Sequence, residues 1–101
     1  NSFKERRNFV VDSLNNINGI SCLSPEGAFY VFPNCKKLLN KKSKLKTDKD
    51  FVEKLLEKAE VAVVQGSAFG LDGYFRISYA TSMENLKKAM KRIKTFCDSI
   101  N

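Results

Sequence analysis

Arg76 stands in the segment GSAFGLDGYFRISYATS, which runs from Gly66 to Ser82 and otherwise has the pattern of a buried strand after a glycine-rich loop. A guanidinium presents planar, paired N–H donors that match a carboxylate or a phosphate, and a lysine cannot reproduce this geometry. The loop glycines would let the backbone approach another group closely, although they are more simply explained as turn residues. By residue chemistry alone, a surface or structurally paired arginine is favoured over an anion-binding one.

The alternation around Arg76 predicts the direction in which it points. On a strand over residues 74–79, the period of two places Phe75, Ile77 and Tyr79 on one face and Arg76 on the other. The apolar face is expected to join the core. We therefore expect Arg76 to point away from the core, beside the glycine-rich loop.

Other reactive side chains do not have the pattern of a catalytic or metal site. Cys22, Cys35 and Cys97 lack metal-ligand spacing, and the chain contains no histidine. Free thiols in a reducing compartment are favoured, with Cys97 on the apolar stripe of the last helix. Ser43 and Lys44 form a serine-lysine pair inside a lysine-rich segment without neighbouring glycine or arginine, so we expect no catalytic role for Lys44.

The formal net charge of +7 is concentrated between Lys36 and Lys49, where seven lysines accompany the single acid Asp48. Nucleic-acid sites usually add arginines for bidentate contacts and aromatic residues for stacking, and this run has neither. A solvated, mobile lysine-rich loop over residues 36–49 is the favoured interpretation, and a phosphate-binding patch is the alternative. No specific nucleic-acid binding is expected.

Helical periodicity occurs in three parts of the chain. A first helix is predicted over residues 2–17, and a second follows the lysine-rich loop with Asp48 or Asp50 as its N-cap. The last helix is predicted to begin at Thr81, whose side chain would form a capping box with Glu84. The predicted inner stripes are Phe3, Val10, Leu14 and Ile17 in the first helix, and Phe51, Val52, Leu55, Leu56 and Ala59 in the second.

Three short strands are predicted between these helices, over residues 28–32, 61–64 and 74–79. The first is apolar on both faces, so one face is expected to look toward a surface that this small chain does not supply. The order of elements indicates an α+β fold, with a small antiparallel or mixed sheet of about three strands and helices packed on one side.

The 101-residue length suits one domain with a modest core. The longest apolar runs are too short to cross a bilayer, and the N-terminal residues lack the apolar region of a secretory signal. A cytoplasmic protein without membrane contact is therefore expected.

Three ordered segments resemble a known family: PEGAFYVFPN (25–34), VAVVQGSAFG (61–70) and GYFRISYATSMENLKKAMKRI (73–93). They look like the C-terminal small domain of bacterial aspartate aminotransferases, which are class I/II, fold-type I enzymes that use pyridoxal 5'-phosphate. The resemblance covers nearly the whole chain and is weakest in the lysine-rich loop. In that family the arginine of R-I-S-Y-A grips the substrate α-carboxylate, which implies this role for Arg76. The aromatic residue of G-A-F-Y lies near that arginine, which implies substrate binding by Phe29.

The resemblance also indicates what the chain lacks. No lysine has the setting of a Schiff base, and no aspartate partner or phosphate cup for the cofactor is evident. Pyridoxal phosphate is therefore expected in the full-length enzyme and not on this chain alone. Members usually have a proline where Gln65 stands, so the fixed φ at the loop entrance is lost. Residues 1–101 are interpreted as a single small domain of a longer enzyme.

The resemblance implies a role in substrate recognition during amino transfer, with aspartate and 2-oxoglutarate as the favoured substrates. Aromatic amino acids, alanine and prephenate remain open as alternatives. The implied partners are amino-acid and 2-oxo-acid substrates, the missing large domain and a second subunit in a homodimer. Two other classes remain: a small basic nucleic-acid-binding module and a stand-alone interaction domain.

Overall fold

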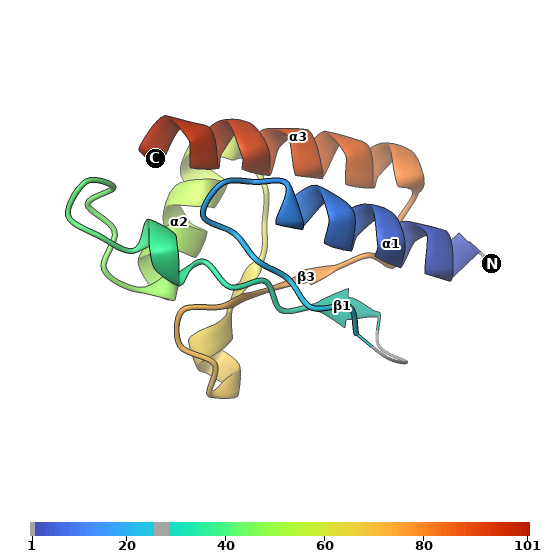
Figure 1. The fold of residues 1–101 in the computed structure, drawn as a ribbon, viewed down its shortest axis with the longest axis horizontal. Helices are drawn as coiled ribbons and strands as arrows, with labels where there is room; N and C mark the ends of the chain where they lie inside the picture. The colour runs from blue at the N-terminus through green and yellow to red at the C-terminus, as the bar shows by residue number, and fades with distance from the viewer. Residues whose placement is uncertain (1, 26–28) are drawn as a thin grey trace.

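The computed structural model describes residues 2–25 and 29–101 (Figure 1). The described residues form three α-helices, three short strands and two 3-10 helices. Their bounds are α1 (Ser2–Asn15), β1 (Tyr30–Val31), η1 (Lys36–Leu38), α2 (Asp48–Ala59), β2 (Val64–Gln65), η2 (Gly66–Phe69), β3 (Phe75–Ser78) and α3 (Met83–Ile100). No helix in this part of the chain is long and apolar enough to span a membrane.

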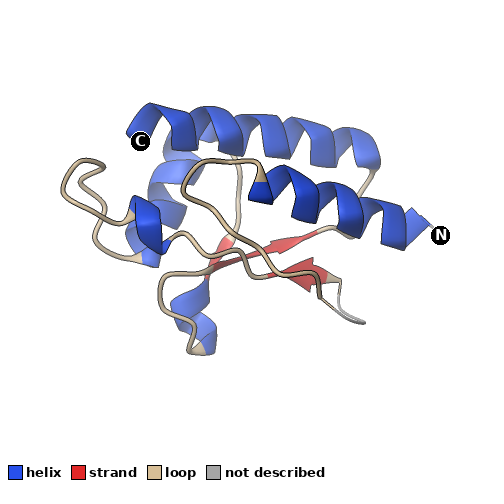
Figure 2. Ribbon diagram, in the orientation of Figure 1, coloured by secondary structure: helices blue, strands red, loops and turns tan. Residues whose placement is uncertain are grey.

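The sheet has the strand order β1-β3-β2, and both pairings are antiparallel. Tyr30 pairs with Ser78 on one side of β3, and Val64 pairs with Arg76 on the other. The three helices lie on one side of the sheet, and η2 lies on the other (Figure 2). The predicted α+β class is therefore confirmed, with every described strand pair antiparallel.

The strands are shorter than predicted. Residue 28, the start of the first predicted strand, lies outside the described residues. That strand ends at Val31, close before Pro33, whose ring cannot donate to a sheet ladder. The second begins only at Val64 and gives way to η2 at Gly66, where the chain turns.

The core lies between the helices and the sheet. Phe51 of α2 contacts Phe75 of β3 and Phe96 of α3, with ring centroids 5.2 Å and 5.6 Å apart. These aromatic contacts join two helices to the central strand. The largest fully buried side chains are Phe51, Phe75, Leu14, Leu38, Leu55, Leu86, Ile93, Val10, Val31, Pro33, Cys35 and Cys97.

Two of the predicted helix stripes need correction at single positions. Val10 and Leu14 of α1 are buried as predicted, but Phe3 is 41% exposed and packs on Phe29 instead, at 5.2 Å between ring centroids. In α2, Phe51 and Leu55 are buried as predicted, but Leu56 is 53% exposed. Ile17 is buried but lies beyond the end of α1.

The predicted N-caps are wrong by one to three positions. Thr47 caps α2, because its hydroxyl accepts from the Asp50 N–H while the Asp50 carboxylate accepts from the Thr47 N–H. Ser82 caps α3 by accepting a hydrogen bond of 3.1 Å from the Asn85 N–H. Thr81 instead accepts a bond from the Asn85 side chain, so the predicted capping box with Glu84 does not form. Several Ser, Thr and Asp residues near each helix start make this register ambiguous in sequence.

The lysine-rich loop is more structured than predicted. Leu38 and Leu45 are buried at its two ends, and η1 forms at its start. The Ser43 hydroxyl accepts from the Leu45 N–H, and its backbone N–H donates to Asn40 Oδ1. All the lysines of the loop are exposed, so the positive charge lies in solvent as predicted.

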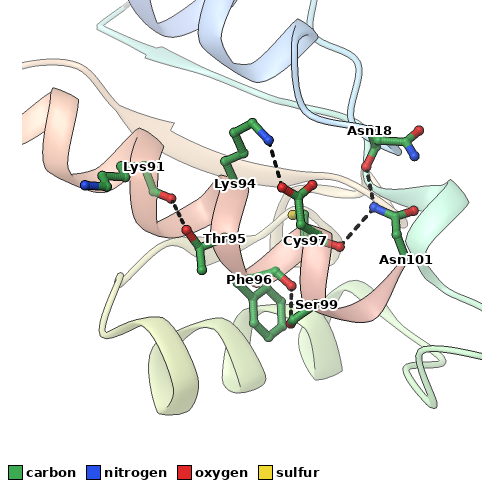
Figure 3. Close-up of polar contacts among 9 residues, drawn as sticks. Asn18, Lys91, Lys94, Thr95, Phe96, Cys97, Ser99 and Asn101 are labelled. Atoms are coloured by element: carbon green, nitrogen blue, oxygen red, sulfur yellow. Dashed lines mark hydrogen bonds and ion pairs between the residues drawn. The ribbon is translucent and has the colours of Figure 1, made fainter.

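The end of α3 is fastened to the turn after α1. Asn101 Nδ2 donates to the Asn18 carbonyl at 2.8 Å and to the Cys97 carbonyl at 2.9 Å (Figure 3). A Lys94–Asp98 ion pair of 2.7 Å lies on the exposed side of the same helix. The first and last helices are thereby held side by side above the sheet (Figure 1).

Candidate functional site

Arg76 lies on the face of β3 that points away from the core. Its neighbours Phe75 and Ile77 are buried, whereas Arg76 is half-buried and Ser78 is exposed. The predicted alternation of this strand is therefore confirmed. Among the described residues, no carboxylate forms an ion pair with Arg76. The fold thus presents an arginine whose charge is not matched by an acidic group in this part of the chain.

Two aromatic rings contact the guanidinium of Arg76. Its Cζ atom lies 4.8 Å from the centroid of Tyr30 and 4.7 Å from the centroid of Phe69. Phe32 touches both rings edge-on, at 5.8 Å from Tyr30 and 5.7 Å from Phe69. Together, Tyr30, Phe32 and Phe69 form an aromatic cup around Arg76. A cation is attracted to the face of such rings, and this attraction does not require a hydrogen bond from the guanidinium.

The aromatic cup was not predicted from the sequence. Tyr30 and Phe69 are 46 and 7 residues from Arg76, and only the strand order places them on both sides of β3. One signal was present: Tyr30 and Phe32 alternate with the buried Val31, so both lie on the face opposite the core.

Phe29, the second predicted site residue, lies beside the end of β3. Its carbonyl accepts a 3.0 Å hydrogen bond from the Tyr79 N–H, and its side chain is 57% exposed. The ring packs on Phe3, whereas the rings over the guanidinium are those of Tyr30 and Phe69. The structure therefore brings the Phe29 backbone to the strand of Arg76, and substrate contact by its ring stays a prediction.

The glycine-rich loop is folded tightly against β3. The Gly66 N–H donates to the Tyr74 carbonyl at 2.7 Å, and a side chain at position 66 would overlap the carbonyl oxygens of Leu71 and Tyr74. Gly70 closes η2 with a φ of +77°, which L side chains rarely adopt. These glycines have the turn role considered for them above.

Asp48 holds this loop in place, whereas its sequence position predicted only that it could be the N-cap of a helix. The side chain is 3% exposed and accepts hydrogen bonds from the Ser67 N–H at 2.8 Å and the Gly73 N–H at 3.3 Å. Burial by itself would raise the pKa of Asp48, but the hydrogen bonds from Ser67 and Gly73 stabilise the carboxylate and lower the pKa below its usual value. The carboxylate thus fixes η2 and the start of β3 to the first turn of α2.

Gln65 enters the loop with φ −63° and ψ 137°, and the φ is the value that a proline ring would impose. The hydrogen bond from the Gly66 N–H to the Tyr74 carbonyl makes Gln65 and Phe75 a non-hydrogen-bonded pair of the ladder. The Gln65 N–H therefore donates no hydrogen bond to β3. The backbone therefore keeps a proline-compatible geometry without the proline.

The three cysteines are buried and free. Burial raises the pKa of Cys22 to about 11, and burial together with a nearby charge raises those of Cys35 and Cys97 to about 12. A neutral thiol is a poor nucleophile, so these side chains serve as core residues. In the described part of the chain, no three Cys, Asp or Glu side chains gather as a metal-binding group.

The chain is similar in sequence to known proteins. Residues 1–93 match the model of the family "Aminotransferase class I and II". A probable aspartate/prephenate aminotransferase of Rhizobium leguminosarum bv. phaseoli is 56% identical over 99 residues, which cover 94% of this chain and 25% of that protein.

Solved structures show the same fold. The crystal structure of an aspartate aminotransferase from Rhizobium meliloti has a TM-score of 0.95 and 53% identity, and the match covers 99% of this chain and 26% of that one. An alanine aminotransferase from Pyrococcus furiosus has a TM-score of 0.86 and 39% identity, and the match covers 96% of this chain and 24% of that one. The chain thus spans about a quarter of the length of the relatives that it matches. With the family model matched over most of its residues, the chain belongs to the aminotransferase class I and II family.

Proposed function

We propose that this chain is the C-terminal small domain of a pyridoxal-phosphate-dependent aminotransferase, and that it binds the α-carboxylate of the substrate. The observation that carries the proposal is the setting of Arg76, which faces away from the core inside the aromatic cup without a carboxylate partner among the described residues. A planar fork of N–H donors in this setting suits a carboxylate brought by a substrate. Phe29, held beside β3 by its backbone, is proposed as a second substrate contact.

The contribution of Arg76 is orientation. Fixing the α-carboxylate by two parallel hydrogen bonds restricts rotation of the substrate, so that its α-proton lies where a base of the larger enzyme can remove it. Movement of the domain toward the rest of the enzyme would bring Arg76 onto the bound substrate.

The family implies pyridoxal phosphate, which supplies an electron-withdrawing ring for amino-group chemistry when it is bound. The residues of this chain do not fit a site for it. Every lysine side chain is exposed, including Lys44, so none lies in the enclosed setting that covalent attachment of a cofactor needs. We therefore assign the cofactor lysine to the remainder of the enzyme and derive no chemical step through the cofactor from these residues.

Aspartate is the proposed amino donor and 2-oxoglutarate the proposed acceptor, because both Rhizobium relatives reported above carry aspartate in their names. One of these names also includes prephenate, and a solved relative is an alanine aminotransferase. The residues that distinguish these substrates are proposed to lie in the large domain. A homodimer of the full-length enzyme is part of the same proposal.

The test is an amino-transfer assay of the full-length protein with pyridoxal phosphate. We expect the highest kcat/KM with aspartate, compared with alanine and phenylalanine as donors and with prephenate as an alternative acceptor. No transfer with any pair would overturn the proposal, and a higher value for another pair would correct the substrate.

The isolated chain provides the control for the cofactor assignment. After incubation with pyridoxal phosphate and borohydride reduction, we expect no stoichiometric adduct on a single lysine, and no amino transfer. A single-site adduct would contradict the assignment, whereas low, scattered labelling of the exposed lysines would agree with it.

A further inference from the structure

We propose that Phe69 and Tyr30 are positioning residues that hold the Arg76 guanidinium ready for its anion. The inference rests on the proposed carboxylate-binding role of Arg76 and adds to it the residues that set the orientation of the arginine. Both rings contact the guanidinium carbon, at 4.7 Å for Phe69 and 4.8 Å for Tyr30. No residue outside this pair has a ring contact of this kind with Arg76 among the described residues.

The two rings come from different elements. Tyr30 belongs to β1, and Phe69 belongs to η2, which follows β2, so they reach Arg76 from the two neighbours of β3. Phe32 contacts both rings edge-on. The side chain of Arg76 is therefore confined by the sheet beneath it and by aromatic rings from both sides.

This confinement acts on the arginine without using its hydrogen-bond donors. An arginine has long, flexible side-chain torsions, and ordering them when a ligand arrives opposes binding. Contact of the guanidinium carbon with two rings orders the side chain beforehand, without a hydrogen bond that would use the donors needed by a carboxylate. Lower ordering cost on binding is the usual result of such preorganisation.

The exposure of Phe69 and Tyr30 distinguishes a positioning role from a role in the core. Phe69 is 46% exposed and Tyr30 is 40% exposed, and neither belongs to the buried core cluster. Replacement of either ring should therefore change global stability little. The loss should be seen in substrate binding instead.

The position of Phe69 is itself fixed by the loop. Gly70 closes η2 directly after it, and Asp48 accepts a hydrogen bond from the Ser67 N–H two residues before it. The hydrogen bond to Asp48 of α2 thus determines where the Phe69 ring can lie. Leu71, in the same loop and also partly exposed, has no ring and provides a matched control.

The experiment uses the full-length enzyme loaded with its cofactor and normalised to bound cofactor. The variants are Phe69→Leu, Tyr30→Leu, the ring-retaining Phe69→Tyr and the control Leu71→Ala, beside Arg76→Lys. For each, KM and kcat are measured with aspartate. The competitive inhibition constant of propionate is also measured, because propionate has a carboxylate but no amino group and cannot react.

We expect Phe69→Leu and Tyr30→Leu to raise both the KM for aspartate and the inhibition constant of propionate by about 2- to 30-fold, with a smaller change in kcat. Phe69→Tyr should restore values near the wild type, and Leu71→Ala should leave both constants unchanged. A merely structural role would lower the cofactor-loaded fraction without moving KM.

The inference is overturned if both leucine variants leave the two constants unchanged, or if Leu71→Ala raises them equally. It is also overturned if Phe69→Tyr fails to restore them. Should Arg76→Lys itself leave them unchanged, the carboxylate-binding proposal fails together with the inference. Loss in Arg76→Lys without loss in the leucine variants removes the positioning role alone.

Discussion

Individual side chains in this domain act through partners that are distant in sequence. Asp48 illustrates this, because it begins α2 yet accepts hydrogen bonds from backbone groups 19 and 25 residues further along the chain. Local sequence patterns predict that Asp48 caps the helix, but the N-cap of α2 is Thr47. The contacts of Asp48 depend on how α2 packs on the glycine-rich loop, which local sequence patterns do not specify.

At pH 7, Asp48→Asn should lower the free energy of unfolding by about 1–3 kcal/mol, because the buried N–H groups of Ser67 and Gly73 lose a charged acceptor. The lowered pKa of Asp48 means that its contribution is fully present above the unfolded pKa of about 3.9 and is lost as the pH falls through the folded value. Urea denaturation at pH 7 and at lower pH measures this difference.

The control for this prediction is Asp72→Asn, which changes an exposed carboxylate in the same loop. It should have little effect at either pH. A destabilisation by Asp48→Asn that stayed equal on acidification would show that the charge of Asp48 is not the source of its contribution.

At the scale of elements, the sequence predicts best what depends on local periodicity. The alternation in β3 follows from four consecutive residues, and the buried positions of α3 follow from a regular 3.6-residue repeat. Strand ends and helix caps are less predictable, because adjacent Ser, Thr and Asp residues at 47–50 and 81–82 offer competing caps. The aromatic cup requires the order β1-β3-β2, which no local pattern contains.

Gln65, at the entrance of the glycine-rich loop, has a backbone geometry that a proline can adopt. Gln65→Pro should stabilise the domain by about 0.4–1 kcal/mol, because the backbone already has the required φ and the ladder does not use the Gln65 N–H. Val64 before it is extended, as a residue preceding proline prefers. Thermal and urea unfolding of the wild-type and Gln65→Pro domains measure the change in the free energy of unfolding.

Gln65→Ala is the matched control, since it removes the same side chain without restricting φ. A destabilisation by proline larger than that by alanine would mean that the Gln65 N–H, or a different backbone angle, matters in solution.

At the scale of the whole molecule, the two sides of the sheet differ. The helices cover one side, while η2 lies on the other (Figure 2). On the side of η2, Tyr30 and Phe69 are 40% and 46% exposed, and elsewhere Leu23 and Phe29 are 90% and 57% exposed. From these exposed side chains and the apolar strand around Tyr30, we expect part of the surface to face something outside this chain.

The isolated chain should therefore self-associate as its concentration rises from micromolar to millimolar. Sedimentation velocity over this range measures the association. Leu23→Ser with Phe29→Ser should reduce it, whereas Leu56→Ser, which changes an exposed leucine on α2, should not. A strict monomer at every concentration would contradict the expectation.

The central claim is that Arg76 binds the substrate carboxylate, and the most direct test is Arg76→Lys in the full-length enzyme. Lysine keeps the charge but loses the paired planar donors, so kcat/KM for aspartate should fall by about 30-fold to several thousand-fold while the cofactor still loads, which corresponds to about 2–5 kcal/mol. The unfolding midpoint of the isolated chain should change little, because no carboxylate among the described residues pairs with Arg76. A kcat/KM near that of the wild type, or a fall explained by unfolding of the domain, would contradict the claim.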